Sequence, residues 1–126
     1  MALAHSMSAK IVPMIHVPDV RATADWYVSI GFTLVRGNEE DGQLDWALLS
    51  YGGSEIMLSL GGKPSSAHRR EFDLYIHVEN VDRLYDSLKD KAELVEALHD
   101  TFYGMREFVI WDCNRFWITF GQPTRQ

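Results

Sequence analysis

Two histidines of this chain occupy equivalent places in a repeated segment, and histidine can bind metals or transfer protons near neutral pH. His16 opens the run His-Val-Pro-Asp-Val, and 61 residues later His77 opens the run His-Val-Glu-Asn-Val. Together with Glu55, these two side chains form one candidate reactive site. The simpler interpretation, which we favour, is that both imidazoles are hydrogen-bonded near strand ends. The other histidines fall in leader, linker or exposed stretches and are predicted to face solvent: His5, His68 and His99.

A second kind of chemistry comes from aromatic residues outside the predicted helices, namely Trp46, Tyr51, Tyr75, Phe102, Tyr103, Trp111 and Trp117. Aromatic faces stack on flat heterocycles and attract cations, which suits a planar, positively charged ligand. Asp45 and Asp73 lie beside such rings and could meet a ligand's amines. Each ring could instead pack in a core or an interface, and for Trp46, Tyr75 and Tyr103 both interpretations stay open. Core packing is predicted for the helix aromatics Trp26, Tyr27 and Tyr85.

Other reactive groups give weaker signals. Cys113 follows Asp112, whose charge works against a thiolate. The run Gly61-Gly62-Lys63-Pro64 places proline where a phosphate-binding loop would begin its helix. Arg106 and Glu107 are predicted to form an ion pair with a structural or dimer role.

The sequence segments that must position these residues occur in two similar copies. Besides the histidine segments, Ile-Met-Leu-Ser-Leu-Gly at 56–61 is echoed by Phe-Trp-Ile-Thr-Phe-Gly at 116–121. Alternation and helical spacing predict the order β-α-β-β-β in each copy. The predicted elements are a strand 10–17, a helix 20–29 capped by Asp19 and stopped by Gly31, strands 32–36, 44–51 and 54–60, a strand 72–78, a helix capped by Asn80, and strands 94–98, 107–111 and 116–120. A polar loop is expected at 37–42 and a left-handed turn residue at Asn114.

Length and composition set the outer limits. We expect one α+β domain with a leader 1–8, modules 9–62 and 71–122, a linker 63–70 and a tail 123–126. No apolar run approaches the length of a membrane span. The net charge of −6 argues against nonspecific DNA binding, and a single cysteine fits a reducing cytoplasm.

The chain resembles the vicinal-oxygen-chelate (glyoxalase/bleomycin resistance/dioxygenase) superfamily, and within it the bleomycin-resistance proteins, over about residues 9–121. The resemblance rests on Val-Pro-Asp-Val at 17–20, Asp-Trp-Tyr at 25–27, Val-Asp-Arg-Leu-Tyr at 81–85 and Tyr-Gly-Met-Arg-Glu-Phe at 103–108. The last hairpin departs from the usual Asp-Pro-x-Gly-Asn, since it reads Asp-Cys-Asn-Arg-Phe at 112–116. The implied fold is a half-open barrel built from two βαβββ modules.

Enzymes of this superfamily usually hold a divalent metal at four inward strand positions. The resemblance places these positions at Val12, Asp73, Thr119 and Met57, with Ser59 replacing Met57 if the register slips. Only Asp73 is a good ligand, whereas a catalytic site needs about three. No metal and no other cofactor are therefore predicted.

The resemblance also implies a function. Bleomycin-binding proteins line their groove with aromatics at places matched here by Trp46, by Tyr75, and by Tyr103 or Phe102. The predicted ligand-binding set is completed by Asp73, Met57 and Trp111. We expect a cytoplasmic homodimer with pockets at the subunit boundary, in which the N-terminal strand near Pro13 could be exchanged. Its predicted function is metal-independent sequestration of a flat aromatic small molecule, with a positive charge allowed, as in antibiotic resistance. The alternatives are an enzyme of the same fold with a non-standard His/Glu/Asp site, and an interaction module whose cleft is filled by Trp111 and Trp117.

Overall fold

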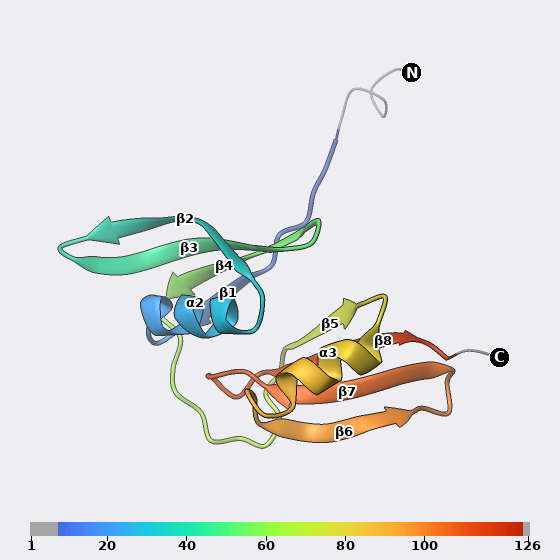
Figure 1. Cartoon of the computed structure of the whole chain (residues 1–126). Helices are drawn as coiled ribbons and strands as arrows, with labels where there is room; N and C mark the ends of the chain where they lie inside the picture. Colours follow the sequence, from blue (N-terminus) through green and yellow to red (C-terminus); the bar gives the residue numbers. More distant parts are fainter. Residues whose placement is uncertain (1–7, 125–126) are drawn as a thin grey trace.

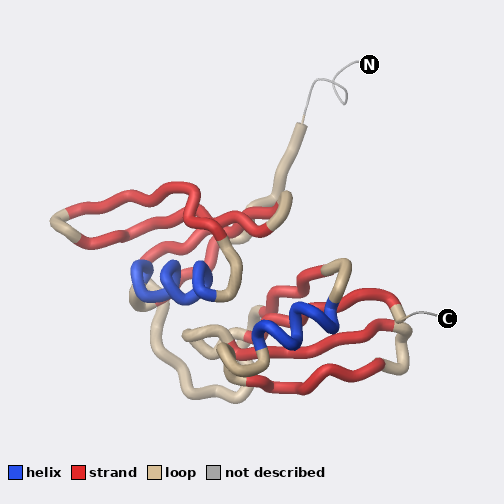
Figure 2. Tube along the Cα trace, viewed as in Figure 1, coloured by secondary structure: helices blue, strands red, loops and turns tan. Residues whose placement is uncertain are grey.

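A computed structural model describes residues 8–124 and shows two similar modules (Figures 1 and 2). The first comprises β1 (Met14–Val17), α2 (Val20–Ser29), β2 (Thr33–Glu40), β3 (Gln43–Tyr51) and β4 (Ser54–Leu60). The second comprises β5 (Asp73–His77), α3 (Val81–Leu88), β6 (Leu94–Asp100), β7 (Met105–Trp111) and β8 (Trp117–Pro123). This confirms the α+β class and the β-α-β-β-β order. Nearly all of the predicted leader, with His5, lies outside the described residues.

Each module folds its strands into one open four-stranded sheet. The strand orders are β1-β4-β3-β2 and β5-β8-β7-β6, so β1 and β5 occupy equivalent edges. These two edge strands pair in parallel with β4 and β8, and all other pairs are antiparallel. The two sheets therefore repeat one topology and neither closes into a barrel.

Both helices begin as their capping residues predict. The side chain of Asp19 accepts a hydrogen bond from the Ala22 amide at 2.9 Å, and that of Asn80 accepts one from the Arg83 amide at 3.1 Å. These bonds satisfy amides that have no partner within the helix. Gly31 has φ +120°, a conformation that glycine adopts easily after a helix end.

Three local predictions were wrong. The predicted loop 37–42 is the end of β2 and a two-residue turn, in which Asp41 and Gly42 have φ values of 53° and 78°. Asp-Gly is the favoured sequence for such a hairpin turn. β1 starts only at Met14, because Pro13 has no amide hydrogen for the ladder. In the last hairpin the left-handed residue is Arg115, with φ 72°, and not Asn114.

The core lies where the helices meet the sheets, and in Figure 1 both helices lie in the space between the two sheets. Alternate strand residues point into this space. They and the helix residues form one continuous buried cluster, which includes Val20, Tyr27, Leu49, Leu58, Val81, Phe108, Ile118 and Phe120. The opposite face of each sheet, turned away from the helices, is called its outer face below.

A buried polar cluster joins the two modules inside this core. The Tyr27 hydroxyl donates to Asp112 Oδ2 at 2.6 Å, and Asp112 Oδ1 accepts from the amides of Asn114 and Phe116 at 2.7 and 2.9 Å. Burial raises the pKa of both Tyr27 and Asp112. The Asn114 amide group also donates to Thr23 Oγ1 at 2.9 Å. The turn between β7 and β8 is thereby fixed to α2.

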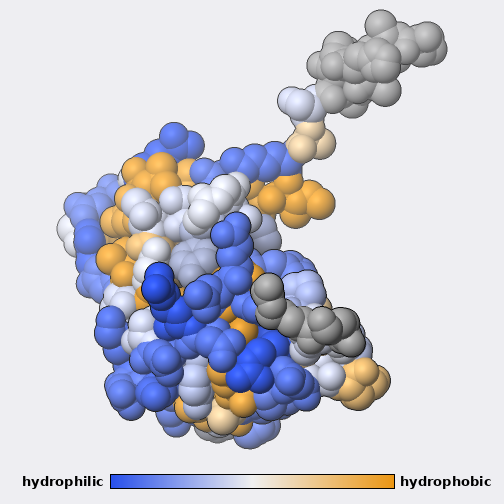
Figure 3. All heavy atoms as spheres, turned by 45° about the vertical axis from the view of Figure 1, so that its right-hand side comes forward, coloured by the Kyte–Doolittle hydropathy of each residue, from blue (hydrophilic) through white to orange (hydrophobic). Residues whose placement is uncertain are grey.

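Within residues 8–124, no helix is long and apolar enough to cross a membrane. On the face drawn in Figure 3, hydrophobic atoms show on the first module, in the upper part of the picture, among hydrophilic ones. Several large apolar or aromatic side chains are exposed, and the most exposed are Ile11 at 91% and Phe102 at 99%.

Candidate functional site

The outer face of the second sheet brings two predicted site tyrosines onto one carboxylate. Glu107, on β7, is only 4% exposed. The Tyr75 hydroxyl donates to its Oε2 and the Tyr103 hydroxyl donates to its Oε1, both at 2.6 Å. The two tyrosines are 44% and 56% exposed, so their hydroxyl ends are fixed while their rings face solvent. The tyrosine clasp, as we call Tyr75, Tyr103 and Glu107, is the main feature of the site.

Local geometry explains how the clasp forms. Tyr75 and Asp73 share the outer face, because alternate residues of a strand point to the same side, and Tyr75 pairs with Thr119 of β8. Its ring crosses Gly121, where a Cβ would lie 2.3 Å from the Tyr75 hydroxyl. A missing side chain at Gly121 thus makes room for the tyrosine. Of the two adjacent aromatics in the β6–β7 turn, Tyr103 reaches Glu107, whereas Phe102 protrudes from the tip and packs edge-on against Tyr103.

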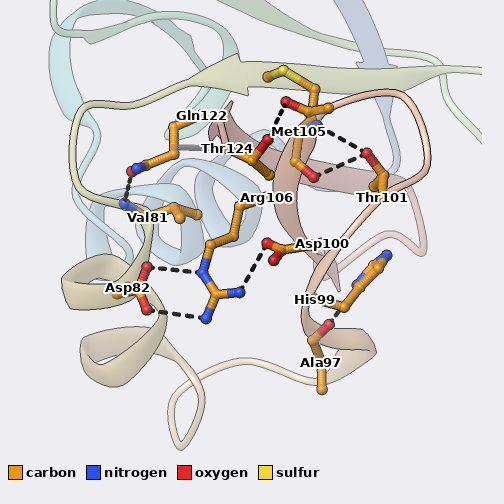
Figure 4. Close-up of polar contacts among 11 residues, drawn as sticks. Val81, Asp82, Ala97, His99, Asp100, Thr101, Met105, Arg106, Gln122 and Thr124 are labelled. Atoms are coloured by element: carbon orange, nitrogen blue, oxygen red, sulfur yellow. Dashed lines mark hydrogen bonds and ion pairs between the residues drawn. The ribbon is translucent and has the colours of Figure 1, made fainter. Parts of the chain in front are cut away.

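The predicted ion pair between Arg106 and Glu107 was wrong. Neighbouring strand residues point to opposite faces, so the two side chains diverge. Arg106 donates two hydrogen bonds to Asp82, at 3.0 and 3.2 Å, and one to Asp100 at 2.9 Å (Figure 4). These bonds raise the pKa of Arg106 and lower that of Asp82. A cavity of about 280 Å³ lies beside this group, but the charges around it are already paired, which indicates a structural role.

The other end of the same outer face is covered by the linker between the modules. Trp111 and Trp117 pair across β7 and β8, and both indole N–H groups donate to the His68 carbonyl at 2.9 Å. The Arg69 guanidinium lies 4.2 Å from the Trp117 ring and the Arg115 guanidinium 4.4 Å from the Trp111 ring. The Trp111 ring, a predicted ligand contact, is therefore already covered by the chain's own linker and by Arg115.

Asp73, another predicted site residue, belongs to this covered end. Its Oδ2 is paired with Arg69, while Oδ1 is buried and has no hydrogen-bond partner among the described residues. His68 is exposed, as predicted, but its ring also packs edge-on against both tryptophans.

A cleft of about 600 Å³ opens beside the tyrosine clasp, where the first module approaches β5. Its lining is mainly apolar and includes Ile11, Phe32, Tyr51, Leu74 and Tyr75. Such a volume suits a small organic ligand. Tyr75 belongs to both the cleft and the clasp, so the two are continuous.

Glu55 and His77, two members of the hypothetical reactive constellation, also line the cleft. Glu55 is paired with Lys10, and the His77 ring lies 4.9 Å from that of Tyr75. His16 does not line the cleft, and its Nδ1 lies 3.2 Å from the Leu60 carbonyl oxygen at the end of the strand. The three side chains are therefore engaged separately.

Trp46 and Met57 lie on the outer face of the first sheet, away from the clasp. Met57 pairs with Met14 and Leu48, and Trp46 pairs with Ser59. The Arg36 guanidinium lies 5.9 Å from the Trp46 ring. Because the helices separate the two outer faces, a single chain does not bring Trp46 and Met57 together with Tyr75 and Tyr103.

The residues at the superfamily's metal positions do not fit a divalent ion. Valine, methionine and threonine stand at 12, 57 and 119, and the carboxylate of Asp73 is paired with Arg69. Among residues 8–124, no three His, Cys, Asp or Glu side chains come together in a group that could hold a metal. Cys113 offers no reactive thiolate, because desolvation and the nearby Asp112 carboxylate raise its pKa to about 11.

Comparison with known proteins places this arrangement in a family. The sequence profile of the Glyoxalase/Bleomycin resistance protein/Dioxygenase superfamily matches residues 5–120. No curated protein matches the chain by sequence search.

Solved structures share the fold at low sequence identity. TioX from Micromonospora sp. ML1 is 23% identical, with a TM-score of 0.76, over 93% of this chain and 100% of that one. A bleomycin-binding protein complexed with bleomycin is 14% identical, with a TM-score of 0.71, over 93% and 100%. TnmS3, an antibiotic binding protein from Streptomyces sp. CB03234, is 21% identical, with a TM-score of 0.67, over 94% and 99%. Identities this low bear on the fold alone.

Proposed function

Because the chain belongs to the Glyoxalase/Bleomycin resistance protein/Dioxygenase superfamily, we propose that it binds and sequesters a flat aromatic small molecule without a metal. The tyrosine clasp carries this proposal. Its two exposed rings are fixed at their hydroxyl ends, and one of them also lines the cleft. Flat ligands gain from stacking on such rings, and fixed rings lose little rotamer entropy on binding. Two neighbours of the same fold are named for antibiotic binding and for bleomycin binding, which agrees with this function.

Sequestration needs no broken bond, since protection follows from lowering the concentration of free compound. Each tenfold increase in affinity requires about 1.4 kcal/mol of binding free energy. A buried aromatic contact supplies about 0.5–1.5 kcal/mol beyond its area. Two such contacts and an apolar cleft are therefore enough for useful affinity.

The direct test is a fluorescence titration with bleomycin and a panel of other flat aromatic compounds. We expect saturable quenching by at least one compound, unchanged after dialysis against EDTA. Tyr103→Ala should weaken this binding about tenfold, whereas the neighbouring Phe102→Ala should change it little, because Phe102 is 99% exposed and is not part of the clasp. Absence of saturable binding across the panel would contradict the proposal, as would binding that returns only with an added divalent ion.

We further propose that the working unit is a homodimer in which the first sheet of one copy faces the second sheet of the other. The predicted site residues are divided between two outer faces, and this pairing would reunite them. Exposed apolar side chains on those faces, such as Met14 at 49% and Tyr75 at 44%, support the arrangement. Exchange of the N-terminal segment near Pro13 would extend the same contact, since Ile11 is almost wholly exposed.

Sedimentation velocity tests the dimer. Met14→Glu should shift the protein toward monomer and weaken ligand binding together, because it places a charge in the proposed contact. Val28→Glu is the matched control, since Val28 is similarly exposed, at 45%, but lies on α2. A monomeric wild-type protein that still binds ligand would contradict the dimer and leave the binding proposal intact.

A further inference from the structure

Glu107 is a nearly buried carboxylate with an unusual set of partners. Each of its two oxygens accepts a hydrogen bond from a tyrosine hydroxyl, and these bonds are to neutral donors. In the part of the chain that the structure describes, it forms no ion pair with Lys, Arg or His. A charge removed from water is expensive unless a counter-charge compensates it. The negative charge of Glu107 is therefore available to a positive group brought by a ligand.

The clasp is held in place before any ligand arrives. Tyr75 crosses the space left by Gly121, and the His77 ring packs against it. The turn that carries Tyr103 is closed by hydrogen bonds in both directions between Thr101 and Met105. Burial and the bond to Glu107 raise the pKa of Tyr75, and the bond to Glu107 raises that of Tyr103, so both remain hydroxyl donors. The two hydroxyls meet on one carboxylate, and both rings remain partly exposed to solvent.

The same sheet face already shows what kind of group its aromatic rings attract. The Trp111 and Trp117 rings each carry a guanidinium of the chain at 4.4 and 4.2 Å. No Lys or Arg of residues 8–124 lies over Tyr75 or Tyr103. These are the rings of this face that stay open beside an uncompensated carboxylate.

From this juxtaposition we propose that Glu107 determines the specificity of the site: it positions the Tyr75 and Tyr103 rings and makes the site select planar cations over neutral rings of the same shape. This inference rests on the proposed function and goes further, because stacking alone would accept a neutral ring equally well. A planar cation gains from the ring faces and from the carboxylate between them.

The test compares two probes of nearly equal shape by fluorescence titration. Acridine is uncharged at neutral pH, whereas 9-aminoacridine carries a positive charge there. Wild-type protein should bind the cation about tenfold more tightly. Glu107→Gln keeps the size of the side chain and a hydrogen-bonding group but removes the charge. It should therefore abolish this preference, mainly by lowering the affinity for 9-aminoacridine. Asp86→Asn removes an exposed charge from α3, on the opposite side of the sheet from the clasp, and should retain the preference.

A second variant keeps the test valid if Glu107→Gln does not fold. Tyr103→Phe removes one hydroxyl and leaves the charge, so the preference for 9-aminoacridine should survive even where both affinities fall. Equal affinity of the wild-type protein for the two probes would overturn the inference. An equal loss of affinity for both probes in Glu107→Gln would overturn it as well. Failure of the wild-type protein to bind any flat aromatic compound would instead overturn the proposed function and, with it, this inference.

Discussion

Replacing Gly121 with alanine is expected to lower the affinity for a flat aromatic ligand by about tenfold or more, since a tenfold loss needs only about 1.4 kcal/mol. The new Cβ would lie 2.3 Å from the Tyr75 hydroxyl oxygen, 3.0 Å from its Cζ and 3.2 Å from Glu107 Cγ. Both side chains must move, so the hydrogen bond between them breaks. The Tyr75 ring then loses its fixed position in the clasp. Overpacking of this kind also costs about 1–3 kcal/mol of folding free energy. Ligand titration and urea unfolding of the variant measure the two effects.

A second substitution should partly reverse the effect of the first. Tyr75→Phe removes the atom that the new methyl group meets most closely, so Gly121→Ala with Tyr75→Phe should regain stability relative to Gly121→Ala alone. Gly53→Ala is the control for stability, because its Cβ meets nothing within 4 Å. If Gly121→Ala binds as tightly as the wild-type protein, the position of the Tyr75 ring does not matter for binding.

The sequence predicted the framework well because the framework depends on local patterns. Asp19 and Asn80 cap their helices through hydrogen bonds to amides three residues ahead, which a capping residue makes without help from distant parts of the chain. The shared face of Asp73 and Tyr75 likewise follows from alternation along one strand. The turn at Asp41 and Gly42 could have been predicted by the same reasoning, since Asp-Gly between strand-like runs is a strong hairpin signal.

The partner of Glu107 could not be predicted in this way. Its two hydroxyl donors come from residues 32 positions earlier and 4 positions earlier in the chain, and the register of β5, β8 and β7 together with the β6–β7 turn brings them to one carboxylate. The pairing of Arg106 with Glu107 was a sequence-neighbour argument, which strand alternation contradicts. The division of Trp46 and Met57 from Tyr75 and Tyr103 depends on which faces the helices cover, and this is decided by packing between modules.

The largest effect on stability is expected from Asp112→Ala, at about 3 kcal/mol or more. The substitution would leave the Tyr27 hydroxyl and the amides of Asn114 and Phe116 without their acceptor inside the core. Each buried donor left unsatisfied costs about 1–3 kcal/mol, against a total stability of about 5–15 kcal/mol for a typical domain. Because these bonds join α2 to the β7–β8 turn, the loss should also loosen the contact between the modules. Urea unfolding at neutral pH measures the change.

Two control variants distinguish the effect of losing this buried cluster from the effect of losing an ordinary surface charge. Asp86→Ala removes an exposed carboxylate paired with Lys89 and should cost less than about 1 kcal/mol. Asp112→Asn keeps the side chain's shape without its charge and should be far less destabilising than Asp112→Ala.

Because burial raises the pKa of Asp112 in the folded protein, the folded state binds a proton more readily than the unfolded state. Wild-type stability should therefore fall, relative to Asp112→Asn, as the pH rises from the carboxyl's ordinary pKa through its raised one. A relative change in the opposite direction would mean that the folded protein favours the charged carboxylate, and that the core at Asp112 is more polar than its contacts indicate.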